Sequence, residues 1–83
     1  MIATIYSTDH CPYCEAAKNL LIKRGIEFNV IEMTRSGADR LLLQEQTGRL
    51  SFPQIVLNGE NIGGFEELRA LYSSDMATLG HLG

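Results

Sequence analysis

The chain has 83 residues, of which 45% are hydrophobic, and this composition is typical of one small globular domain. Its formal net charge is −3 and its lysines and arginines form no cluster, so nucleic acid is not expected as a partner. The sequence has neither an apolar run long enough to span a membrane nor a secretory signal at its start, so we expect no membrane partner and a cytoplasmic location.

The first part of the chain predicts a β-α-β unit. Residues 2–7 are mostly β-branched or aromatic and predict a buried strand. From Pro12 to Arg24 the apolar and small side chains recur at helical spacing, and Gly25 suits the position just after the helix end. Residues 26–30 alternate between apolar and polar and predict a second strand, parallel to the first.

A helix and a hairpin are expected next. The segment Ser36–Asp39 resembles a capping box, with Asp39 as its third helical residue, and Gly48 is a suitable end for the helix. Two extended runs, 54–57 and 60–62, flank Asn58-Gly59, which is the strongest short-range signal of a β-hairpin.

The last predicted element is a third helix over residues 65–72, with apolar side chains at 65, 68, 71 and 72. Residues 74–83 are weakly patterned and predict a loose tail or a short final turn. The element order β-α-β-α-β-β-α is that of an α/β fold with a four-stranded mixed sheet flanked by three helices. We expect a single domain over residues 1–83.

The two cysteines of the chain are spaced as Cys11-Pro12-Tyr13-Cys14, between the first strand and the first helix. A C-x-x-C pair at such a junction in a cytosolic protein is typical of redox chemistry, and a permanent structural disulfide is uncommon in that compartment. Pro12 suits the first helical position, so the free N–H groups of the helix start would stabilise a Cys11 thiolate. We therefore expect Cys11 to be the exposed nucleophile, Cys14 the resolving thiol, and Cys11 and Cys14 together the active-site disulfide.

Two plainer readings of the cysteines remain open. A structural zinc site needs four ligands, and the histidines that could complete it are His10, which is adjacent to Cys11, and His81, which lies in the tail. We expect no metal on that count. The cysteines could also be inert core residues, since free cysteine is often buried.

The motif Cys11-Pro-Tyr-Cys14, the pair Phe52-Pro53, and Gly63-Gly64 followed by Glu66 together resemble the dithiol glutaredoxins, over about residues 2–72. Pro-Tyr between the cysteines separates this family from thioredoxin, which usually has Gly-Pro. The resemblance implies a thioredoxin-like fold and glutathione as co-substrate. It implies a glutathione-dependent thiol–disulfide oxidoreductase that reduces protein–glutathione mixed disulfides and the disulfides of client proteins.

The resemblance also implies a glutathione-binding groove. Its residues would be Tyr13, Gln44, Phe52, Pro53, Gly64, Phe65 and Glu66. Pro53 would be a cis proline opposite the active-site disulfide, and the backbone of Phe52 would pair with the cysteinyl part of glutathione. Residues 64–66 would bind the γ-glutamyl carboxylate through backbone N–H groups, and Gln44 would contact the glycyl carboxylate. Tyr13 would flank the site, although an exposed aromatic residue in a turn and a solvated helix glutamine are the plainer interpretations of Tyr13 and Gln44.

The chain departs from the family pattern near the cysteines. Thr8 stands where the family commonly has a lysine that helps to hold the thiolate and the glycyl carboxylate. His10 could replace part of that charge, and either Arg40 or Arg49 could bind the carboxylate. Ser51-Phe52 replaces the usual Thr-Val before the proline, which makes the groove bulkier.

Two other functions remain alternatives. The protein could be a glutaredoxin-like hydrogen donor that is reduced by thioredoxin reductase, which the missing lysine would favour. It could also be a dimer that binds an iron–sulfur cluster through Cys11 and two glutathiones, but Pro12 argues against this, and we expect a monomer.

Overall fold

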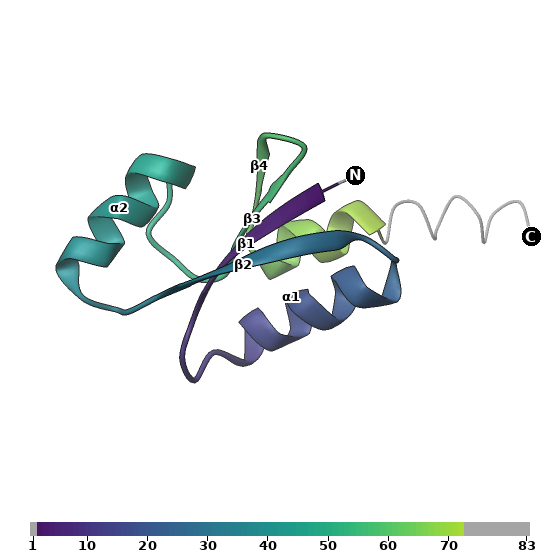
Figure 1. Ribbon diagram of the computed structural model, residues 1–83, viewed down its shortest axis with the longest axis horizontal. Helices are drawn as coiled ribbons and strands as arrows, with labels where there is room; N and C mark the ends of the chain where they lie inside the picture. The colour runs from purple at the N-terminus through teal and green to yellow at the C-terminus, as the bar shows by residue number, and fades with distance from the viewer. Residues whose placement is uncertain (1, 73–83) are drawn as a thin grey trace, which may run out of the picture.

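A computed structural model describes residues 2–72 and has the element order expected from the sequence (Figure 1). Its labelled elements are β1 (Ile2–Thr8), α1 (Pro12–Lys23), β2 (Glu27–Met33), α2 (Gly37–Thr47), β3 (Gln54–Leu57) and β4 (Glu60–Gly63). A third helix, drawn in yellow-green in Figure 1, follows over residues 65–72. The expected tail, residues 74–83, lies outside the described residues.

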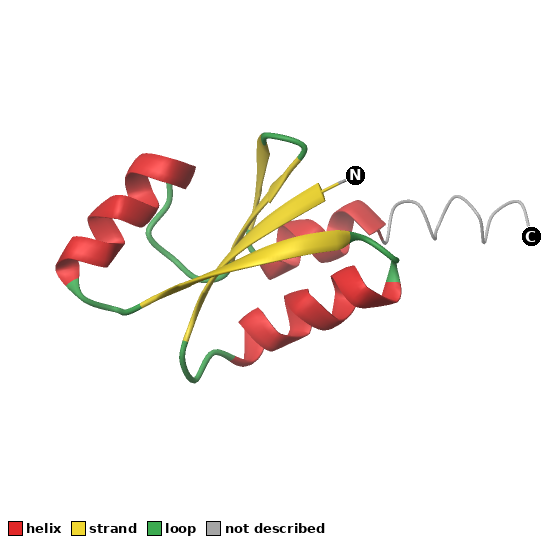
Figure 2. Ribbon diagram, in the orientation of Figure 1, coloured by secondary structure: helices red, strands yellow, loops and turns green. Residues whose placement is uncertain are grey.

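The four strands form one mixed sheet in the order β2-β1-β3-β4. Figure 2 shows the strands in yellow and the helices around them in red. β1 and β2 are parallel, with Ile2 opposite Glu27 and Thr8 opposite Met33. β1 pairs with β3, and β3 with β4, in antiparallel fashion. The expected parallel pair and hairpin are therefore both confirmed, and they make this the sheet of a thioredoxin-like fold.

Helices cover both faces of the sheet, because successive residues of a strand point to opposite faces. One buried cluster joins the sheet to α1 and the third helix, which lie side by side in Figure 1. It consists of Ala3, Ile5, Ala17, Leu21, Ile55 and Leu68. A smaller cluster of Tyr6, Met33 and Leu43 joins the other face to α2. Neighbouring β1 residues thus contribute to different cores, which fixes the register of the strand that leads to Cys11.

The connection from β2 to α2 is held by side chains. Ser36 is the N-cap of α2, and its Oγ accepts a hydrogen bond from the N–H of Asp39 at 3.2 Å, as the capping motif predicts. The Asp39 carboxylate, however, accepts from the N–H of Thr34 at 2.6 Å and from the hydroxyl of Thr34 at 2.7 Å. One half of the predicted capping box thus forms at Ser36, whereas Asp39 binds Thr34 at the end of β2 instead of the N-cap. These bonds fix the loop between β2 and α2 on both sides of Arg35.

Two residues of the predicted apolar stripes are exposed. Val30, an apolar residue of the alternating pattern that predicts the second strand, is 41% exposed because β2 is an edge strand of the sheet. Tyr13 continues the apolar spacing of α1, yet it is 59% exposed because it lies in the first turn of the helix, near the cysteines. Tyr13 thus lies outside the core and on the surface around the cysteines.

Candidate active site

Cys11 begins the first helix at the carboxyl end of β1. It is the N-cap of α1, with φ −122° and ψ 96°, and Pro12 follows as the first helical residue. The N–H of Cys14 donates to the Cys11 Sγ at 3.2 Å and also lies 3.0 Å from the Cys11 carbonyl oxygen. A backbone donor and the positive end of a helix dipole therefore both face this sulfur, and both stabilise negative charge on it.

Cys14 lies one turn into α1 and is fully buried, whereas Cys11 is partly exposed. Both are free thiols in this structure. Burial raises the pKa of the Cys14 thiol, and its contact with Cys11 acts in the same direction, while hydrogen bonding to Ser7 and Thr8 opposes the shift. The pair thus combines an accessible sulfur at the helix start with a shielded sulfur that stays protonated at neutral pH.

A groove of about 370 Å³ opens beside Cys11. Its lining residues are Cys11, Arg35, Arg40, Leu50, Ser51 and Phe52. The peptide bond between Phe52 and Pro53 is cis, and Pro53 is buried. The loop before β3 therefore forms one wall of the groove and carries Phe52 to the surface next to the nucleophile.

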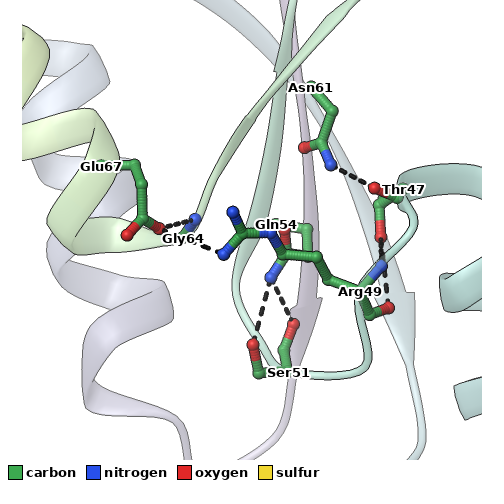
Figure 3. Close-up of polar contacts among 7 residues, drawn as sticks. All are labelled: Thr47, Arg49, Ser51, Gln54, Asn61, Gly64 and Glu67. Atoms are coloured by element: carbon green, nitrogen blue, oxygen red, sulfur yellow. Dashed lines mark hydrogen bonds and ion pairs between the residues drawn. The ribbon is translucent and has the colours of Figure 1, made fainter.

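Figure 3 shows how this loop is tied to its neighbours. The amide nitrogen of the buried Gln54 donates to the Ser51 carbonyl oxygen at 2.8 Å, and that of Asn61 on β4 donates to the Thr47 carbonyl oxygen at the end of α2. These bonds connect the loop to the sheet at both ends. They hold the wall that carries Phe52 at a fixed position relative to Cys11.

The third helix begins on the other side of Pro53. A Cβ on Gly64 would lie 3.3 Å from the Pro53 carbonyl oxygen, so this close approach favours glycine. The Gly64 N–H donates to Glu67 Oε1 at 2.6 Å, and Glu67 also lies 3.9 Å from Arg49 Nη1 (Figure 3). Glu67 was not singled out in the sequence, although an acidic residue three positions after Gly64 is the pattern of a cap.

The other predicted groove residues are only partly assembled. The ring of Phe65 lies 5.9 Å from that of Tyr13, centroid to centroid, so these two aromatic residues form one surface. The Glu66 carboxylate pairs with Arg69 at 2.6 Å, one turn along the helix. Gln44 is exposed on α2 and is not among the residues that line the groove.

The structure distinguishes Arg40 from Arg49, the two arginines that the sequence left as alternatives for binding a carboxylate. Arg40 lines the groove beside Cys11, whereas Arg49 is paired with Glu67. Arg35, which the sequence reading missed, also lines the groove. Its signal was its place two residues after β2, because the parallel strands β1 and β2 end at the same edge of the sheet, where Cys11 lies.

Among residues 2–72 there is no group of three or more His, Cys, Asp or Glu side chains arranged to hold a metal ion. No helix in the same part of the chain is long and apolar enough to cross a membrane. The sheet order, the capping cysteine with its buried partner, and the cis proline loop beside them define a dithiol protein of thioredoxin fold.

Comparison with known proteins identifies the family. The Glutaredoxin family profile matches residues 3–62. Glutaredoxin 3 of Escherichia coli K12 is 37% identical over 67 residues, which are 81% of each chain. A glutaredoxin from Brucella melitensis, solved in solution, superposes with a TM-score of 0.73 at 39% identity over 99% of this chain and 87% of its own. The protein belongs to the glutaredoxin family and is a thiol–disulfide oxidoreductase, and Cys11 and Cys14 fit a redox-active pair.

A buckwheat glutaredoxin solved as a complex with glutathione has the same fold, with a TM-score of 0.75 at 23% identity over 88% of this chain and 69% of that one. At this level of identity the likeness concerns the fold alone.

Proposed function

We propose that this protein uses glutathione to reduce protein–glutathione mixed disulfides and protein disulfides, with Cys11 as the nucleophile. The observation that carries the proposal is the position of the Cys11 Sγ. It accepts the Cys14 N–H at 3.2 Å at the helix start and lies in the wall of the groove formed with Phe52. An accessible sulfur with stabilised charge is the nucleophile that disulfide exchange requires.

The first half of the cycle is an exchange at the glutathione sulfur. The Cys11 thiolate attacks that sulfur, a new disulfide forms between Cys11 and glutathione, and the client sulfur leaves as a thiolate that takes up a proton. A second glutathione thiolate then attacks the glutathione sulfur on Cys11. Glutathione disulfide is released and Cys11 returns to the thiolate, so the cycle converts the mixed disulfide and one reduced glutathione into the client thiol and glutathione disulfide.

With a protein disulfide, the mixed disulfide forms between Cys11 and the client instead. Cys14 then loses its proton and attacks the Cys11 sulfur, which releases the reduced client and closes the Cys11–Cys14 disulfide. Because burial raises the pKa of Cys14, the thiol stays protonated until this step, which disfavours premature attack on the glutathionylated enzyme.

The groove offers the contacts that a short peptide needs. The backbone of Phe52 would pair with the cysteinyl part of glutathione, as in the addition of a short strand. Residues 64–66 would face the γ-glutamyl carboxylate with the N–H groups of the third helix start. Because Glu67 already holds the Gly64 N–H, we assign the main contacts to Phe65 and Glu66. Tyr13 and Phe65 would cover the ligand with their joint aromatic surface.

For the glycyl carboxylate, the groove supports Arg40 over Arg49, and Gln44 would contribute only after its side chain turns toward the ligand. We further propose that the protein works as a monomer in a reducing compartment, the cytoplasm, where both cysteines return to thiols after each cycle.

The test is turnover of a small glutathione mixed disulfide, coupled to NADPH and glutathione reductase, for the wild type, Cys11→Ser and Cys14→Ser. We expect activity in the wild type and in Cys14→Ser, and none in Cys11→Ser. Reduction of a protein disulfide should be impaired in both variants. If the folded, reduced wild type turns over only with thioredoxin reductase, the hydrogen-donor alternative is correct instead.

A further inference from the structure

Within the part of the chain that the structure describes, two arginines of the Cys11 groove have no acidic partner. Arg35 and Arg40 both line the groove, and within residues 2–72 neither forms a salt bridge. By contrast, Arg49 and Arg69 are paired with carboxylates on the third helix. In a chain of net charge −3, two unpaired guanidinium groups beside a nucleophile form a local positive wall suited to a carboxylate.

Arg35 is the less expected of the two, because it comes from the loop between β2 and α2 and reaches across to the cysteine turn. Its Nη2 donates to the His10 carbonyl oxygen at 3.4 Å, directly before Cys11. This contact is at an exposed position and uses one of the five N–H donors of a guanidinium group. The remaining donors are available to a ligand in the groove.

The backbone on both sides of Arg35 is fixed. Thr34 donates through its N–H and its hydroxyl to the Asp39 carboxylate, and the Ser36 N–H lies 3.2 Å from the Thr34 hydroxyl oxygen. The Ser36 hydroxyl in turn accepts from the Asp39 N–H. This capping network anchors the loop from which the Arg35 side chain extends, so less freedom is lost when the side chain binds a ligand.

The site lacks a cation on β1 itself. Position 8, at the end of the strand that leads to Cys11, carries Thr8, which is 6% exposed and uncharged. We propose that Arg35 is a substrate-binding residue that, beside Arg40, holds a carboxylate of the disulfide substrate next to Cys11 and so supplies from the β2–α2 loop the charge that β1 lacks. This inference rests on the proposed function. The carboxylate could belong to the glycyl end of glutathione or to an acidic side chain next to a client cysteine, and both offer the same chemistry.

The test compares substrates with and without the carboxylate. The first pair is the mixed disulfide of glutathione with 2-mercaptoethanol and the same compound with the glycyl carboxylate converted to an amide. The second pair is a peptide disulfide with Glu or with Gln beside its cysteine. Arg35→Gln should raise KM by about tenfold for the acidic member of at least one pair, at nearly unchanged kcat, and leave the neutral member unaffected. The pair that responds identifies the source of the carboxylate.

Two variants control for charge and for position. Arg24→Gln removes the same charge at the far end of α1, where Arg24 stacks on Tyr72, and should leave every KM unchanged. Arg35→Lys should restore part of the discrimination. Asp39→Asn, which weakens the capping network, should raise KM for the acidic substrate by less than Arg35→Gln does, and should add nothing in the double variant.

The outcomes separate this inference from the proposed function. If the wild type reduces the glutathione substrate but Arg35→Gln affects acidic and neutral members equally or not at all, the role of Arg35 is overturned and the proposed function stands. If the wild type reduces no glutathione substrate, the proposed function fails. The peptide pair, with thioredoxin reductase as the electron source, then decides the role of Arg35 by the same criterion.

Discussion

Replacing Glu67 tests how the start of the third helix is held at the edge of the groove. In the structure Glu67 Oε1 accepts from the Gly64 N–H at 2.6 Å and lies 3.9 Å from Arg49 Nη1. Glu67→Ala removes both contacts. Glu67→Gln keeps an oxygen acceptor for the Gly64 N–H, since glutamine also occurs at this position of a cap, but removes the charge that faces Arg49.

The two contacts of Glu67 should contribute differently to the free energy of unfolding. Loss of a helix cap destabilises a protein by about 1 kcal/mol. The Arg49 pair is long, and its side chains are 54% and 45% exposed, so it contributes at most a few tenths of a kcal/mol. We therefore expect Glu67→Ala to lower the free energy of unfolding by about 1 kcal/mol, with a fall in Tm of about 4–8 °C for a domain of this size. Glu67→Gln should lose less than about half of that.

Urea and thermal unfolding, followed by circular dichroism in reduced protein, measure both changes. Equal destabilisation by the two substitutions would mean that the negative charge, and not the hydrogen bond, holds the helix start. If neither substitution alters stability, the cap is not formed in solution, and the Gly64 N–H is free for a ligand. Either result would refute the reasoning given above for the third helix.

Three further predictions concern stability. Because burial raises the pKa of Cys14, the folded protein keeps a proton that the unfolded chain loses above about pH 9. The wild type should therefore lose stability as the pH rises from 8 to 10.5, by no more than tenfold in the folding equilibrium per pH unit, and Cys14→Ser should lose less. Equal slopes of stability against pH in parallel urea titrations of the two proteins would contradict this. Leu21→Ala should lower the free energy of unfolding in urea by about 2–5 kcal/mol, because Leu21 is fully buried against the sheet. Ile22→Ala, at a position 64% exposed, should change it by less than about 0.5 kcal/mol, and similar losses in both variants would be inconsistent with the packing of α1. Gly63→Ala should lower stability by about 1–3 kcal/mol, because Gly63 has φ +121° and a Cβ there would lie 2.8 Å from the Glu67 side chain. An unchanged Tm would argue against this backbone conformation.

The fold could be predicted because local signals and the tertiary structure agree. Asn58-Gly59 predicts a hairpin, and both residues have the positive φ values, 51° and 81°, that such a turn requires. Ser36 and Gly48 bound α2 as expected, with Gly48 in the left-handed conformation at φ 79°. The sequence could not reveal that β2 would be an edge strand with Val30 exposed, because strand order depends on contacts between distant segments.

The positions of the two cysteines could likewise be predicted from local sequence. A cysteine before Pro12 at a strand–helix junction must lie near the free N–H groups of the helix start, and the structure has Cys11 there as the N-cap. The burial of Cys14 follows from its place one turn further along α1. The arrangement of one capping thiol and one buried thiol is therefore encoded within a few residues.

The groove could be predicted only in part, because its walls come from four separate segments. The roles of Phe52 and Pro53 were implied by the resemblance, and nothing in their local sequence indicates that they lie near Cys11. The place of Arg35 in the groove was missed because it depends on the parallel pairing of β1 and β2, which brings the loop after β2 to the cysteine edge. Choosing Arg40 over Arg49 needed the contact between Arg49 and Glu67, which joins residues distant in sequence.

The central claim is that Cys11 accepts the glutathionyl group and Cys14 does not, and mass spectrometry tests it directly. Reduced wild type, Cys11→Ser and Cys14→Ser would each be incubated briefly with glutathione disulfide, quenched with acid, and mapped by peptide. We predict one glutathione on Cys11 in Cys14→Ser, none on Cys14 in Cys11→Ser under the same conditions, and an internal Cys11–Cys14 disulfide in the wild type. Glutathione found on Cys14 in Cys11→Ser at a comparable rate, or an unmodified Cys11 in Cys14→Ser, would contradict the account.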